Sequence, residues 1–277
     1  ALAKVAGRDE MPSGASWLSD ALLKRVESMP LNRFKRFTTA GVKAAQMYKV
    51  KRPSWSKAMS TATDRYARIR ESGKRTKREH ENWPKEGYKA LGNLAKTLHS
   101  ENEHLERKKN WNTRDLYHYQ RYLIVLFYSK FALRGDLADV RTKKPLGANY
   151  LLKKGKTYEL HVGEHKTSWA HGAIKLKIDG ELAEALKTFL PQVNRLTNHG
   201  FLLSTLRTGN RMQRQDMLKL IRNITRERLG KNIGVQLIRG LKGSASQKEI
   251  DKAAQLQAEL GHSSTMQRKY ISRDQPQ

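Results

Sequence analysis

The chain has 277 residues, a formal net charge of +29 at pH 7 and no cysteine. The absence of cysteine excludes disulfides and thiolate metal sites, and it suits an intracellular location, wherever the target of the protein lies. No apolar run approaches the length that a membrane span needs, so no membrane partner is expected.

Positive charge is distributed over the whole length of the chain. Residues 1–100 carry 22 Lys and Arg against 9 Asp and Glu, and residues 151–277 carry 23 against 11. A single basic run is commonly only a solvated surface. A surplus along the entire chain favours a polyanionic partner, of which nucleic acid is the commonest.

The first part of the chain is predicted to be helical. Leu18 and Leu22 indicate one helix near Ser16. A second helix carries an apolar stripe at helical spacing that Gly73 is suited to cap, made of Trp55, Met59, Ala62, Tyr66 and Ile69. We expect a small helical module over residues 1–73 and a basic linker over residues 74–80.

Two helices are predicted after the linker. Pro84 is suited to the first position of a helix that carries Tyr88, Leu91, Ala95 and Leu98. Residues 101–113 are charged and are expected to be irregular. Residues 114–133 are dense in aliphatic and aromatic side chains, which predicts a buried helix that ends near Arg134.

The periodicity then changes from helix to strand. Apolar residues alternate in two short segments, at Tyr158, Leu160 and Val162 and again at Ile174, Leu176 and Ile178. A polar, glycine-containing stretch separates the segments. The pattern predicts a β-hairpin with residues 164–168 at or near its tip.

Helices are predicted again in the last hundred residues. Residues 181–190 are expected to form a helix that Pro191 stops, and residues 211–229 one that Gly230 caps. A Ser-x-x-Glu capping box at residues 246–249 opens a last helix. The predicted fold class is therefore mainly α with a small antiparallel β-sheet (α+β).

Three motifs follow one another in the second domain, which we place at residues 81–277. They are Ala132–Val140 (ALRGDLADV), Gln236–Arg239 (QLIR) and Leu260–Ser264 (LGHSS), and Tyr270 follows the last. In this order they resemble the two arginine boxes, the Leu-Gly-His box and the tyrosine of phage-type tyrosine recombinases and integrases. The resemblance implies that the N-terminal module is a core-binding-like DNA-binding part and that the second domain is catalytic.

The resemblance implies a role for each matching residue. Arg134 and Arg239 would clamp the scissile phosphate, a task that suits the guanidinium fork and its permanent charge. Tyr270 would be the nucleophile and would form a 3′-phosphotyrosine. An isolated tyrosine with a pKa near 10 is a poor nucleophile, so nearby cations must favour its phenolate.

Three further positions complete the implied site. Lys166, in the predicted hairpin, would protonate the leaving 5′-oxygen, and His262 would hydrogen-bond the phosphate or support proton transfer. Gln236 stands where the family usually has His or Lys. Its amide can donate a hydrogen bond but cannot titrate, so it cannot serve as a general base. The spacing from His262 to Tyr270 is one residue shorter than the usual pattern.

Other chemistries find little support in the sequence. His161, His165 and His171 lie near one another in the chain but have no acidic or thiol partner, so a metal site is not expected. No phosphate-cradling glycine-rich loop is present, and no nucleotide or other cofactor is implied.

The leading interpretation is a site-specific DNA recombinase or integrase that needs no metal and acts on double-stranded DNA, as a tetramer by family analogy. One alternative is a type IB topoisomerase, which uses the same chemistry as a monomer. The other is a DNA-binding protein on the same fold that no longer cuts, which Gln236 leaves open.

Overall fold

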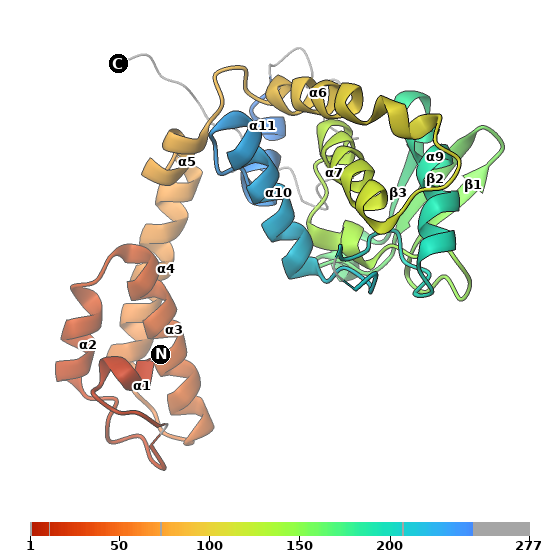
Figure 1. Cartoon of the computed structure of the whole chain (residues 1–277). Coiled ribbons are helices and arrows are strands. Elements are labelled where there is room, and N and C mark those ends of the chain that lie inside the picture. Colours follow the sequence, from red (N-terminus) through yellow and green to blue (C-terminus); the bar gives the residue numbers. More distant parts are fainter. Residues whose placement is uncertain (1, 11, 73, 207, 246–277) are drawn as a thin grey trace. The chain divides into compact units, whose positions relative to one another are not determined.

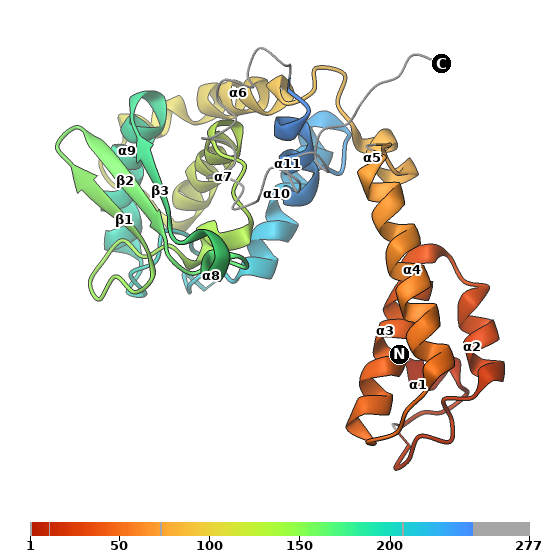
Figure 2. The same cartoon turned by 180° about the vertical axis from the view of Figure 1, so that it is seen from behind.

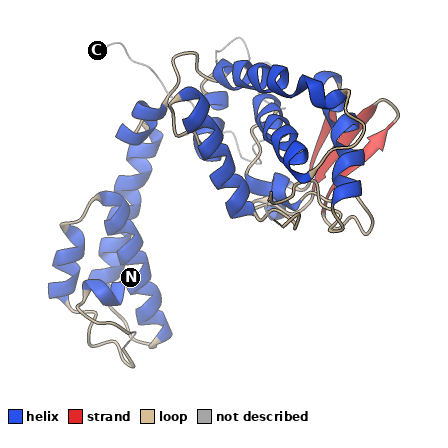
Figure 3. Ribbon diagram, in the orientation of Figure 1, coloured by secondary structure: helices blue, strands red, loops and turns tan. Residues whose placement is uncertain are grey.

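The structure is a computed structural model that describes residues 2–10, 12–72, 74–206 and 208–245 (Figure 1). The chain divides into two compact units, Ala1–Lys74 and Arg75–Gln277. Each unit has its own cluster of buried apolar side chains. Helices dominate both units, and strands occur in the second, as Figure 3 shows. The predicted class, mainly α with a small antiparallel sheet, is confirmed.

The N-terminal unit consists of four helices. They are α1 (Leu2–Val5), α2 (Asp20–Glu27), α3 (Leu31–Met47) and α4 (Pro53–Glu71). Trp55 on α4 is fully buried, whereas Ile69 at the other end of the predicted stripe is 49% exposed. A Cβ on Gly41 of α3 would lie 2.1 Å from Cε3 of Trp55, so the indole ring packs directly on the α3 backbone.

The segment expected to be a basic linker, residues 74–80, is partly helical. Helix α5 (Lys77–Asn82) begins in it with a capping box. Thr76 Oγ1 accepts from the Glu79 N–H at 3.2 Å, and Glu79 Oε2 accepts from the Thr76 N–H at 2.9 Å. The reciprocal cap satisfies two amides that a short helix would otherwise expose, which explains why a strongly basic segment is helical here.

The second unit is built around two long helices that pack against each other, α6 (Lys89–Glu106) and α7 (Thr113–Lys130). The prediction that a helix starts at Pro84 is wrong, because Gly87 has φ +59° and interrupts any earlier start. The prediction of an irregular segment over residues 101–113 is wrong up to residue 106 and is confirmed for residues 107–112. Leu105 is buried in the same core as the rest of α6, so the helix continues to it.

A three-stranded antiparallel sheet lies beside these helices, in the order β1 (Asn149–Lys154), β2 (Thr157–Val162) and β3 (Ile174–Ile178). The predicted hairpin is confirmed as β2 and β3, whose apolar residues alternate inward. Strand β1 has no counterpart among the predicted elements. The connection between β2 and β3 contains the short helix α8 (Ser168–His171), which lies beyond the ends of these strands in Figure 2.

Three helices complete the described part of this unit: α9 (Gly180–Leu196), α10 (Arg214–Leu229) and α11 (Val235–Gly243). The prediction that Pro191 stops α9 is wrong, because the proline lies inside the helix. Its position is exposed, so water can reach the carbonyl group that the missing N–H leaves free. Gly230 caps α10 in the left-handed conformation, as predicted. The capping box at residues 246–249 lies outside the described residues.

Candidate functional site

Arg134 lies just after α7, where the chain turns into the short 3-10 helix η1 (Gly135–Asp139). The buried Tyr128 hydroxyl donates a hydrogen bond of 2.6 Å to the Arg134 carbonyl oxygen and so holds its backbone. The Arg134 side chain is half-buried, and its Nη1 donates to Thr167 Oγ1 at 3.2 Å. This bond joins the first arginine box to the connection between β2 and β3.

The β2–β3 connection is held at both of its ends. Next to β2, the Asn149 side chain on β1 accepts from the Glu164 N–H at 2.9 Å and donates to its carbonyl at 3.1 Å. At the far end, His165 Nε2 donates to the Gly172 carbonyl oxygen at 2.9 Å. Lys166, the predicted general acid, lies exposed between these anchors.

A directed chain of hydrogen bonds runs from Arg134 into this connection. A carbonyl can only accept, so His165 Nε2 carries a proton, and in the neutral imidazole Nδ1 is then the acceptor. Thr167 Oγ1 lies 3.4 Å from His165 Nδ1 and also receives the Arg134 N–H. The threonine hydroxyl thus accepts from the arginine and donates to the imidazole, which fixes the position of the residue beside Lys166.

Asp136 forms a buried ion pair two residues after Arg134. It is 2% exposed, and Arg214 Nη2 on α10 donates to it at 2.9 Å and to Asp139 at 2.6 Å. Burial raises the pKa of Asp136, and the charges of Arg214 and Arg134 act against that rise. The ion pair fastens η1, and with it the first arginine box, to α10.

Gly135 makes this ion pair possible. A Cβ at this position would lie 2.8 Å from Cγ of Arg214 and 3.0 Å from its Cδ. Any larger residue between Arg134 and Asp136 would therefore push the Arg214 stem away from the two carboxylates. The glycine of the predicted box has a packing role beside the candidate arginine.

Arg239 lies on α11 and is 2% exposed. Its charge reaches the Tyr128 hydroxyl. Burial raises the pKa of Tyr128, Asp136 adds to the rise, and Arg214 and Arg239 oppose it. Tyr128 is therefore linked to Arg134 by a hydrogen bond to its carbonyl group and is influenced by the charge of Arg239.

Gln236 lies one helical turn before Arg239 on α11, and its side chain is exposed. Residues three apart on a helix are neighbours at about 5–6 Å between Cβ atoms. The second box therefore presents a buried guanidinium and an exposed amide from the same part of α11. His262 and Tyr270 lie outside the described residues.

Sequence reasoning missed several residues of this site. It assigned Tyr128 only to a buried helix and included Asp136 only as part of the box. A carboxylate two residues after the candidate arginine was a usable signal for Asp136. Arg214 gave no local signal, because its partner lies 78 residues away in the chain.

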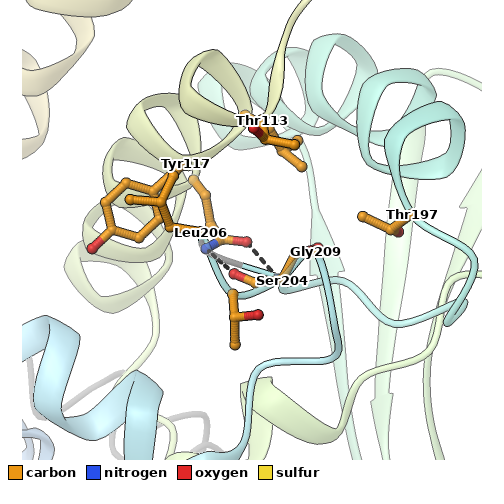
Figure 4. Close-up of a pocket in the computed structure, with 9 residues that line it drawn as sticks. Thr113, Tyr117, Thr197, Ser204, Leu206 and Gly209 are labelled. Carbon is orange, nitrogen blue, oxygen red and sulfur yellow. Dashed lines mark hydrogen bonds between the residues drawn. The ribbon is translucent and has the colours of Figure 1, made fainter.

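Sites of other kinds find no support among the described residues. There, no three His, Asp or Glu side chains are grouped closely enough to hold a metal ion. Figure 4 shows a recess lined by Tyr117, Ser204 and Leu206, among others, with about 10 Å³ of free volume. That is room for about one water molecule, whereas ligand pockets measure roughly 300–1,000 Å³.

The helices of the described ranges are all too short or too polar to cross a membrane. Comparison with models of known families and with curated proteins finds no match. Among solved structures, the chain is similar to one described as the crystal structure of XerA recombinase. The identity is 15%, the match covers 94% of this chain and 86% of that chain, and the TM-score is 0.44. A likeness at this level assigns neither a family nor an activity.

Proposed function

We propose that the chain is a DNA strand-cutting and rejoining enzyme of the tyrosine recombinase type. One observation carries the proposal: the first arginine box is hydrogen-bonded to the connection that carries Lys166. The Arg134 guanidinium donates to Thr167 in that connection, the Arg134 carbonyl accepts from the buried Tyr128 hydroxyl, and the charge of Arg239 acts on the same hydroxyl. Phosphoryl transfer without a metal requires fixed cations, and the two candidate arginines would supply them.

The reaction would use each group for one step. Arg134 and Arg239 would hold the non-bridging oxygens of the scissile phosphate and stabilise the charge that develops on them. The Tyr270 phenolate would attack phosphorus, and the bond from phosphorus to the 5′-oxygen would break. That oxygen would take a proton from the Lys166 ammonium group, which leaves a 3′-phosphotyrosine and a free 5′-hydroxyl.

Arg214 is not proposed as a phosphate ligand, although it lies beside the same cluster. Its guanidinium already bonds Asp136 and Asp139, and these bonds act to raise its pKa against the effect of burial. A cation held between two carboxylates has little remaining attraction for a third anion. We assign Arg214 to positioning the first arginine box.

The exposed Gln236 supports a second candidate function, a DNA-binding protein that does not cut. Gln236 is the first residue of the second box, and its amide cannot take up the proton of Tyr270. Such a protein would bind duplex DNA through the same basic surface but would form no covalent intermediate.

A nicked suicide substrate separates the two candidates. The whole chain, incubated in EDTA with a duplex that releases its 5′-hydroxyl fragment after cleavage, should accumulate a covalent adduct. Peptide mapping should place it on Tyr270, and Tyr270→Phe should abolish it while DNA binding persists. Binding without any adduct favours the non-cutting protein, and an adduct on another tyrosine refutes the assigned register.

The same experiment extends to the type of enzyme. Joining of strands between two different duplexes supports a recombinase that works as a tetramer. Relaxation of supercoils without such joining supports a type IB topoisomerase. Strict dependence of cleavage on Mg²⁺ contradicts both enzymes.

A further inference from the structure

Trp169 is 89% exposed, more than any other large hydrophobic residue among those described. Trp17, Trp55 and Trp111 are each at most 6% exposed. Trp83 is half-buried and lies under the Arg75 guanidinium at 3.7 Å. A packed aromatic side chain buries roughly 150–250 Å², so this exposed indole offers a large apolar face for a contact.

The exposure of Trp169 does not arise from a loosely held backbone. It lies on α8, where Gly172 N–H donates to the Ser168 carbonyl at 2.8 Å and His171 N–H donates to that of Thr167 at 3.1 Å. The His165 ring closes the turn through the Gly172 carbonyl. Gly172 has φ +69° and ψ −164°, a conformation that glycine alone adopts readily. The indole is therefore presented from a preformed turn.

The position of this turn relates it to the candidate phosphate site. Thr167, the residue that accepts from Arg134, lies two positions before Trp169. Their Cα atoms are therefore at most about 7.6 Å apart. Successive bases of one strand rise by about 3.4 Å, so this separation is comparable with the spacing of neighbouring bases.

The charges around Trp169 favour a nucleic acid over an apolar partner. Exposed Lys166 and His171 flank it in the same turn, and Lys175 is exposed at the start of β3, whereas Lys177 further along the strand pairs with Asp179 at 3.4 Å. Glu164 is the exposed acidic residue of this connection. An aromatic ring among cations is the combination that binds nucleobase faces beside a phosphate backbone.

We propose that Trp169 stacks on a nucleobase next to the phosphate that Arg134 holds. The inference rests on the proposed function, since it takes DNA as the ligand of Arg134. Stacking uses the face of a base and not its hydrogen-bonding edge, so the contact tolerates different sequences. It requires a base that is partly unstacked, and the protein should therefore favour nicked duplexes and flexible pyrimidine–purine steps.

The test compares the affinity of the whole chain and its variants for a nicked duplex. Alanine substitution of a base-stacking aromatic typically weakens binding roughly 5- to 150-fold, and we expect Trp169→Ala to fall in this range. Trp169→Phe should recover most of the affinity. Leu206→Ala, at a residue that is 44% exposed in the same unit, is the matched control and should bind like the wild type.

Salt dependence distinguishes stacking from a charge contact. Trp169→Ala should leave the slope of log K against log[salt] unchanged, because the indole releases no counterion. Lys166→Ala, if the lysine contacts a phosphate, should reduce the slope by about 0.9. Bound DNA should also reduce the quenching of the tryptophan fluorescence of the wild type by acrylamide. This protection should be absent in Trp169→Ala.

Each outcome has one meaning. The stacking is refuted if Trp169→Ala binds DNA as tightly as the wild type and if DNA does not reduce the quenching of the wild type. If the wild type still forms the Tyr270 adduct, the proposed function stands. Weaker self-association of Trp169→Ala with unchanged DNA affinity assigns the residue to a protein contact and overturns the proposal. A wild type that does not bind DNA overturns both the stacking and the proposed function.

Discussion

The buried hydroxyl of Tyr128 donates a hydrogen bond of 2.6 Å to the carbonyl oxygen of Arg134, six residues further along the chain. The bond ties the end of α7 to the start of the first arginine box. Burial raises the pKa of this phenol, so Tyr128 stays protonated and is unsuited to act as the nucleophile. Its role is to position the backbone that carries Arg134.

Tyr128→Phe should therefore slow cleavage more than it weakens DNA binding. The free energy of unfolding should fall by about 1–3 kcal/mol, because a buried carbonyl is left without its donor. Tyr119→Phe is the matched control, since its hydroxyl on the same helix donates to Glu106 at 3.0 Å. Both variants should be less stable in denaturant titrations. Equal cleavage rates for the two would refute the positioning role.

Arg134→Ala and Arg239→Ala should each slow single-turnover cleavage by roughly 10²–10³-fold, the usual effect of removing one preorganised donor to a developing charge. DNA affinity should change far less. Arg239 is buried, so Arg239→Lys is needed as well; it keeps the charge but lacks the bidentate fork.

Arg228→Ala is the control for these two variants. Its guanidinium pairs with Glu101 at 2.7–2.8 Å in a partly exposed position. We expect its cleavage rate to stay near that of the wild type. If binding and cleavage fall in equal measure in the Arg134 and Arg239 variants, both arginines are ordinary phosphate contacts.

Lys166→Ala should cleave slowly, and a substrate with a 5′-bridging phosphorothioate should restore much of the rate. Sulfur leaves as a stable thiolate and needs little help from an acid, so the defect shrinks only if Lys166 protonates the leaving oxygen. Lys175→Ala, at an exposed lysine on β3, should show no such selective rescue. If Lys166→Ala is equally slow on the normal and the phosphorothioate substrate, Lys166 is only a solvated surface residue.

His199 should make stability fall in mild acid. Burial lowers the pKa of His199, and Lys143 and Arg211 lower it further. Its Nδ1 accepts from the Phe201 N–H at 2.9 Å, and protonation would destroy that acceptor. Because the unfolded chain takes up a proton first, this contribution to stability is complete above about pH 6.5 and decreases as the pH falls below it.

His199→Asn offers an amide oxygen near the Nδ1 position that does not titrate. Its free energy of unfolding should therefore depend less steeply on pH between about 5 and 6.5 than that of the wild type. Denaturant titrations at several pH values measure the slope. Identical slopes for the two proteins would mean that His199 does not carry this dependence.

The N-terminal unit should bind phosphates of its own. Residues 1–74 carry 16 Lys and Arg against 6 Asp and Glu. Residues 75–277 alone, once shown by thermal unfolding to be folded, should bind duplex DNA with a shallower salt slope than the whole chain, by about 0.9 for each phosphate that the first unit neutralises. Similar slopes would mean that the basic residues of the first unit form only a solvated surface.

The elements that can be predicted well from sequence are those whose packing leaves a regular local pattern. Strands β2 and β3 are half-buried, so their apolar residues alternate and reveal the hairpin. Strand β1 escapes prediction because the polar Asn149 occupies one of its inward positions, where it holds the Glu164 backbone. Pro191 leads to the wrong prediction that α9 stops there, because the local sequence does not show how the residue is packed. Whether a proline ends a helix depends on exposure, which local sequence does not reveal.

The same distinction applies to the site. Arg134, Arg239 and Lys166 are candidates because they resemble motifs, and their roles stay predictions. The hydrogen bond between Arg134 and Thr167 could not be predicted, since it depends on how the end of α7 and the β2–β3 connection pack. The ion pair of Asp136 with Arg214 joins residues 78 positions apart, and only the folded chain brings their charges together.

Because Gly41 and Trp55 are in contact, we expect substitutions at these two positions to be coupled in evolution. A methyl group on Gly41 would overlap the buried indole, so neither residue can change alone without disturbing the packing of α3 on α4. We expect homologues to change both positions together, with alanine or serine at 41 accompanied by a smaller side chain at 55. Such paired changes in an alignment would identify relatives that share this helical unit, even where the motifs of the other unit have diverged beyond recognition.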